Sequence, residues 1–143
     1  MSKLSIYNMA FGFWLLFLAA AAGAFIATDL TAGYIAESGF RETWAMMLTK
    51  SAHGHTNLFA LLHIAFGLTL PYSTLPLKWK IAQTFGLMCG ALAMGLGLLI
   101  RASQPPSNET DLVGIGVGIL LSAALAAIFT HATGLTAKAL KRA

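Results

Sequence analysis

Four long stretches without a charged residue alternate with polar segments along the 143 residues of the chain. A helix that crosses the hydrocarbon core of a bilayer needs about 20 predominantly apolar residues, and each of these stretches is long enough. The pattern predicts a single domain, residues 1–143, with four transmembrane helices at about 5–27, 51–71, 80–101 and 111–135.

Composition supports this fold class, because 57% of the residues are hydrophobic and only 10% are charged. Such values are typical of an all-α, multi-pass membrane protein whose main partner is the lipid bilayer. The polar residues 29–50 are expected to form an outer loop with a short interfacial helix at 43–49. Ser51 is expected to cap the second transmembrane helix.

The basic residues predict the orientation, since loops on the cytoplasmic side carry an excess of lysine and arginine. With four spans, one side of the membrane receives Lys3, Lys78, Lys80, Lys138, Lys141 and Arg142. The other side receives Arg41, Lys50 and Arg101 together with all five acidic residues, Asp29, Glu37, Glu42, Glu109 and Asp111. Both termini are therefore expected in the cytoplasm. The protein is expected in the inner (cytoplasmic) membrane of a bacterium, with His53 and His55 toward the periplasmic side. The net charge of +4 is accounted for in this way, and no nucleic-acid partner is expected.

Three of the four histidines gather in and after the segment Lys50-Ser51-Ala52-His53-Gly54-His55-Thr56-Asn57. Ionisable groups inside a membrane are costly and mark candidate functional sites. On one helix, His53 and His55 point about 200° apart and differ by about 3 Å in depth, so they cannot hold one metal ion together. His63 is expected about 12 Å deeper and about 80° around the helix from His55.

This geometry favours haem held between copies of the chain. In a closed ring of identical subunits, each second helix would offer one imidazole to either side, so that every interface receives His53 from one copy and His55 from the next. Two imidazoles and an apolar slot are typical of a b-type haem that carries electrons. Phe59, Leu58 and Leu62 are expected to line the slot, and Arg101, Arg41 or Lys50 to meet the propionates.

His55-Thr56-Asn57 resembles the low-spin haem ligand segment of the haem-copper oxidase superfamily, particularly of its nitric oxide reductase branch. His53-Gly54-His55 is also similar to the His-x-His on the tenth helix of that superfamily. Its large subunit has twelve helices in three quasi-repeats of four, with ligands on the second helix of each repeat. The resemblance implies a homotrimer, a haem site that includes Asn57, and a propionate-binding role for Arg101. The chain lacks the adjacent His-His pair of the copper centre, so the resemblance implies electron transfer without oxygen or nitric oxide reduction.

Two alternatives remain open from the residues. In the first, a copper-binding or copper-delivery protein uses His53 and His55 with the soft thioethers of Met46 and Met47. In the second, the chain is a cofactor-free structural or assembly subunit. Neither a zinc site nor an activated nucleophile fits the spacing, so the catalytic residues and any electron donor stay unknown, and an electron carrier is favoured over an enzyme.

Single histidines and cationic side chains also have structural interpretations. His63 is a weaker candidate metal ligand, and hydrogen bonding to Thr69 or to a neighbouring helix is favoured for it. His131, beside Thr130 and Thr133, is expected to be a hydrogen-bonded imidazole at the cytoplasmic end of the fourth span. Arg101 is equally compatible with an interfacial position near Glu109 or Asp111.

Overall fold

The structure, a computed structural model, describes residues 1–36, 43–106 and 111–141, and these residues form helices and short connections without a strand. In chain order the elements are α1 (Lys3–Ala36), α2 (Trp44–Thr69), the 3₁₀ turn η1 (Leu70–Tyr72), α3 (Leu77–Leu92), the π-helical segment η2 (Ala93–Gly97), α4 (Leu98–Ala102) and α5 (Leu112–Leu140). Five charged residues that were assigned to a side of the membrane lie outside this part: Glu37, Arg41, Glu42, Glu109 and Arg142.

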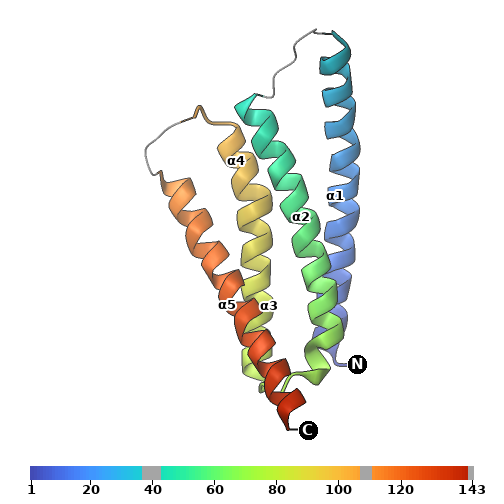
Figure 1. Cartoon of the computed structure of the whole chain (residues 1–143), viewed down its shortest axis with the longest axis vertical. Helices are drawn as coiled ribbons and strands as arrows, with labels where there is room; N and C mark the ends of the chain where they lie inside the picture. Colours follow the sequence, from blue (N-terminus) through green and yellow to red (C-terminus); the bar gives the residue numbers. More distant parts are fainter. Residues whose placement is uncertain (37–42, 107–110, 142–143) are drawn as a thin grey trace.

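The helices form an elongated bundle in which α3, η2 and α4 continue one another as a single column (Figure 1). The α2 helix lies between α1 and this column, while α1 packs chiefly against α2 and α5 chiefly against α3. The start of α1, the turn η1 and the end of α5 gather at one end of the bundle. This is the arrangement expected of a chain that crosses one layer an even number of times.

Within residues 1–36, 43–106 and 111–141, three helices are long and apolar enough to cross a membrane: Lys3–Ala36, Leu77–Ala102 and Leu112–Leu140. The described part of the chain thus has the all-helical fold and the apolar helices expected of a membrane protein. The α2 helix is not among the three, although its 26 residues are sufficient in length. Its histidines and Asn57 lower its hydropathy, and the fourth span stays a prediction.

Two helices are longer than the sequence predicts. The α1 helix continues to Ala36, and α2 begins at Trp44 without a break before residue 51. The residue that caps α2 is Thr43, whose side-chain oxygen accepts a hydrogen bond from the backbone N–H of Met46 at 3.3 Å. The prediction of a cap at Ser51 is therefore wrong, and the described part of the expected outer loop is mostly helical.

The core lies where α2 meets α3 and α5, and its largest members are Phe59, Phe66, Leu70 and Leu87. Between α1 and α2 the backbones also approach closely. A Cβ atom added at Gly12 would lie 2.6 Å from the carbonyl oxygen of Ala60, and one added at Gly67 would lie 2.7 Å from that of Ser5. Close approach gains dispersion contacts, which drive helix association where no hydrophobic effect acts between helices in lipid.

Candidate functional site

His53 faces α1 of its own chain. A Cβ atom at Gly23 would lie 2.5 Å from Cε1 of His53, so the imidazole occupies the space that a side chain on α1 would need. The amide nitrogen of Asn57 donates to Nε2 of His53 at 3.1 Å, and Nδ1 is buried without a partner among the described residues. The ring also borders a cavity of about 360 Å³ between α1, α2 and Leu99 of α4.

His55 is held in a different way. Its Nδ1 lies 2.8 Å from the carbonyl oxygen of Ser51, one helical turn earlier, and 3.3 Å from the hydroxyl of the same residue. A carbonyl oxygen only accepts, so Nδ1 carries the proton and the lone pair is on Nε2. That Nε2 atom has no bond to any residue in the described ranges. The ring is half-buried and its orientation is fixed by its own helix.

The two imidazoles therefore lie on different sides of α2, as the 100° turn per residue predicts. Between them, Gly54 is exposed, and a Cβ atom added there would meet nothing within 4 Å. Among the described residues, no three His, Cys, Asp or Glu side chains converge as they would around a metal ion. The geometry places single imidazole side chains on two faces of one helix.

His63 belongs to a buried network that joins three helices. Its Nδ1 lies 3.1 Å from Oδ1 of Asn8 on α1, and the Asn8 amide nitrogen donates to the hydroxyl of Thr84 on α3 at 3.0 Å. Thr84 in turn donates to the carbonyl oxygen of Lys80 at 3.0 Å. The imidazole is fully buried and packs edge-on against Phe11, with 4.6 Å between ring centroids. His63 is hydrogen-bonded to a neighbouring helix, as favoured from the sequence.

His131 is hydrogen-bonded as expected, with a partner on another helix. Its Nε2 lies 2.8 Å from the hydroxyl of Thr69 on α2, and its ring centroid lies 4.4 Å from that of Phe66. This bond joins α5 to the end of α2 that is close to η1. His131 thus has a packing role far along α2 from His53 and His55.

Arg101 is already engaged within the chain. Its Nη1 atom lies 3.3 Å from Oδ2 of Asp111, and it donates to Oε1 of Gln104 at 3.1 Å. The guanidinium carbon also lies 5.6 Å from the ring centroid of Trp44, so Arg101 connects α4 with the starts of α5 and α2. This agrees with the interfacial interpretation that names Asp111. A propionate would have to compete with Asp111 for the guanidinium.

The positions of Phe59, Met46 and Met47 do not match the roles expected for them, which were to line a haem slot and to bind copper. Phe59 is buried in the core of its own chain, where its ring excludes any side chain at Gly90 of α3, so it cannot line a slot between copies. Met46 borders a small cavity with Asp29, whereas Met47 is 47% exposed. Residues 46–55 span about 14 Å of helix, so these thioethers and the two imidazoles do not form one copper site.

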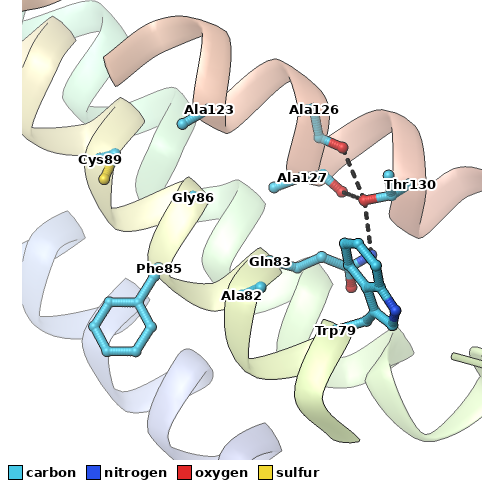
Figure 2. A pocket seen from close by; sticks show the side chains of 10 residues that line it. All are labelled: Trp79, Ala82, Gln83, Phe85, Gly86, Cys89, Ala123, Ala126, Ala127 and Thr130. Atoms are coloured by element: carbon cyan, nitrogen blue, oxygen red, sulfur yellow. Dashed lines mark hydrogen bonds between the residues drawn. The ribbon is translucent and has the colours of Figure 1, made fainter. Parts of the chain in front are cut away.

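A second cavity, of about 470 Å³, lies between α3 and α5 (Figure 2). Its walls are mostly small residues such as Gly86, Ala123 and Ala127. Gln83 reaches across it and donates through Nε2 to the hydroxyl of Thr130 at 2.9 Å, as Figure 2 shows. It contains no histidine, and it is separate from the face of α2 that carries His55.

The sequence interpretation missed Asn8, Thr84 and Gly23. Asn8 bonds to His63, Thr84 bonds to Asn8, and Gly23 leaves the space that the His53 ring occupies. The signal for Asn8 was available, since it is an amide within the first uncharged stretch. Comparison of the chain with protein-family models, with curated proteins and with solved structures found no match. The class defined by the fold and the site is an all-helical protein with apolar helices suited to a membrane and imidazoles on two faces of α2.

Proposed function

We propose that this chain is a small membrane cytochrome that carries electrons through a b-type haem, which His55 of one copy and His53 of a neighbouring copy would hold through their imidazoles. The proposal includes α2 as a fourth membrane span, a homo-oligomer, with a trimer favoured, and both termini in the cytoplasm. His53 and His55 would then lie toward the periplasmic side.

One observation carries the proposal: the hydrogen bond from Nδ1 of His55 to the carbonyl oxygen of Ser51 at 2.8 Å. Histidine ligands of metals usually donate their other ring N–H to a carbonyl or carboxylate, which fixes the tautomer and orients the ring. The same bond in this chain leaves the Nε2 lone pair available. His63 differs from His55 in that its Nδ1 bonds to a residue on a neighbouring helix and its ring is fully buried.

Gly54 and Asn57 affect how a haem would fit between His55 and the His53 of a neighbouring copy. The exposed, side-chain-free position at Gly54 leaves room at the level of the imidazoles. His53 is less prepared, because the Asn57 amide occupies its Nε2. Ligation of a haem shared with a neighbouring copy would require that amide to turn away and the His53 ring to leave its place against Gly23 of α1 in its own chain. Phe59 has no part in this site.

Bound haem would supply a centre that takes up and releases one electron at a time. The residues of the chain would hold it, orient it and exclude water. Arg101 lies at the same end of the bundle as the histidines, and its guanidinium would meet a propionate by exchanging its bond to Asp111.

A fourth span is supported by the position of α2. It lies between α1 and the α3–α4 column, two apolar helices that it accompanies along its length (Figure 1). Five of the six described lysines, Lys3, Lys78, Lys80, Lys138 and Lys141, lie in the helix ends beside η1 and the termini. Lys50 and Arg101 lie with Asp29 and Asp111 toward the other end. Under the positive-inside rule, the end with the termini is cytoplasmic.

The test is an absorption spectrum of detergent-purified protein from haem-replete cells, oxidised and then reduced, with iron and copper measured on the same sample. The proposal predicts a red protein that contains iron without copper and has a Soret band that shifts on reduction. His55→Ala and His53→Ala should each abolish the low-spin spectrum, because each removes one axial ligand.

The matched control is His131→Gln, which alters a buried histidine on another helix. It should leave the spectrum unchanged as long as the protein folds. A colourless wild-type preparation would overturn the proposal and favour a cofactor-free subunit, while copper without iron would favour the copper-binding alternative.

A further inference from the structure

The cavity of about 470 Å³ between α3 and α5 is an open groove, which we call the α3–α5 groove. Figure 2 shows two of its residues, Trp79 and Cys89, near opposite ends. Residues 79–89 of α3 span about 15 Å, which is half of the roughly 30 Å hydrocarbon core of a bilayer. The groove therefore extends over the depth of one leaflet, as one acyl chain of a phospholipid does.

The wall of the groove offers almost no polar surface. Gln83 is only 2% exposed, and its Nε2 donates to the hydroxyl of Thr130 across the groove. The wall is shallow because α3 and α5 approach each other closely: a Cβ atom added at Gly86 would lie 2.8 Å from the carbonyl oxygen of Ala123. Such a wall gains dispersion contacts from a methylene chain and gives a polar ligand little to bond to.

The first turn of α3 makes one end of the groove positive. No side chain caps the N-terminus of α3, and the first backbone N–H that bonds within the turn is that of Trp79. Lys78 is exposed and lies on the same stripe of α3 as the groove residues Ala82, Phe85 and Cys89, at steps of four, three and four residues. The ammonium group, the free N–H groups and the helix dipole all attract an anion to this place.

No carboxylate in the described part of the chain neutralises this end of α3. The two described acidic residues, Asp29 and Asp111, lie toward the opposite end, beside Lys50 and Arg101. Lys78 has no ion pair with any residue in the described ranges. The matching negative charge therefore has to come from outside the chain, and membranes supply it as the phosphates of anionic lipids.

We propose that the α3–α5 groove binds one anionic phospholipid, with its phosphate at Lys78 and the N-terminus of α3 and one acyl chain along the groove. Trp79, 51% exposed, then lies at the level of the head group, where tryptophan is favoured. Lipid that merely covers an apolar face has no preference between head groups, so a charge preference at this groove distinguishes a site from general lipid contact. The inference goes beyond the proposed function and does not depend on haem.

Quenching of tryptophan fluorescence by brominated lipids tests the site. The chain has three tryptophans, and Trp14→Phe with Trp44→Phe leaves Trp79 as the reporter in the groove. The matched control keeps Trp14, 68% exposed on α1, and changes the other two tryptophans to phenylalanine. Each variant is placed in vesicles of phosphatidylglycerol and phosphatidylcholine, with bromine on the acyl chains of one of the two lipids. Both leaflets have the same composition, so the direction of insertion does not matter.

Trp79 should report a preference of about tenfold for phosphatidylglycerol, because a lysine and a helix N-terminus each favour the anion. Trp14 should report no preference. In the Trp79 variant, Lys78→Gln should lower the preference about fivefold. Lys80→Gln is the control for charge, since Lys80 lies about 200° around the helix from Lys78 and should leave the preference unchanged.

Native mass spectrometry of the protein with all three tryptophans gives a second measurement. One phosphatidylglycerol should remain bound in detergent, and Lys78→Gln should lose it. An equal preference at Trp79 and Trp14 would overturn the site. So would Lys80→Gln lowering the preference as much as Lys78→Gln, because anionic lipid would then be attracted to the charged end as a whole.

Discussion

At the scale of single residues, the hydrogen bonds of His63 form a sequence in which every donor has an acceptor. Nδ1 of His63 donates to Asn8, the Asn8 amide donates to Thr84, and Thr84 donates to the carbonyl oxygen of Lys80. Since an unpaired buried polar group costs free energy, the members of this network depend on one another. His63 therefore stabilises the packing of α1, α2 and α3.

A double-mutant cycle on Asn8 and His63 measures this dependence. Asn8→Leu and His63→Leu should each lower the free energy of unfolding by about 1–3 kcal/mol, because each leaves a buried partner unsatisfied. The double variant should cost less than the sum of the two by about 1 kcal/mol or more. The measurement is reversible unfolding in detergent. Strictly additive losses would show that the bond between Asn8 and His63 contributes nothing.

For the candidate site, the sequence predicted the directions in which the histidine side chains point, but not the residues that they and Arg101 contact. The opposed orientation of His53 and His55 follows from the helical turn per residue alone. The contact of His53 with Gly23 and the bond of Arg101 to Asp111 depend on which helices meet, and no spacing within α2 contains that information. Phe59 was misplaced for the same reason, since its side of α2 is covered by α3 and α5.

At the scale of elements, the number and order of the long helices were predictable, and their ends were not. The predictions followed the apolar stretches and so stopped near Asp29 and Lys50, where charge begins. The helices continue past these residues, because a helix needs no apolar side chains outside the hydrocarbon layer and neither proline nor a capping signal interrupts them. The α1 helix, at 34 residues, is about 51 Å long, well beyond the thickness of that layer.

The close contact between α1 and α2 leads to a prediction about the stability of glycine variants. Gly12→Ala should destabilise the protein by about 1–3 kcal/mol, since the added methyl group meets the α2 backbone at the carbonyl oxygen of Ala60 and the nitrogen of Ile64. Gly118→Ala is the matched control, because a Cβ atom there meets nothing within 4 Å. Thermal unfolding in detergent should show a lower midpoint for the first variant only. Equal midpoints would mean that the two helices are not in backbone contact.

At the scale of the whole molecule, the described charges divide between the two ends of the bundle. Five of the six described lysines gather around η1 and the termini, whereas both described acidic residues, Asp29 and Asp111, lie toward the opposite end with Lys50 and Arg101. This division supports the proposed orientation and makes the crossing by α2 testable, because Thr43 and Thr74 flank α2 and η1 on either side.

Labelling of single cysteines tests that crossing. In a Cys89→Ala background, Thr43→Cys should react with a membrane-impermeant maleimide in cells whose outer membrane alone has been opened. Thr74→Cys should react only after the inner membrane is permeabilised. Labelling of both positions from the same side would mean that α2 does not cross the membrane.

The most direct test of the account is complementation between two inactive copies. A His53→Ala chain still offers His55, and a His55→Ala chain still offers His53, so an interface between one copy of each kind retains both ligands. Each variant expressed alone should lack the low-spin haem spectrum, and their co-expression should restore part of it. A mixture as colourless as its components, or either variant alone with the wild-type spectrum, would contradict ligation of haem between copies.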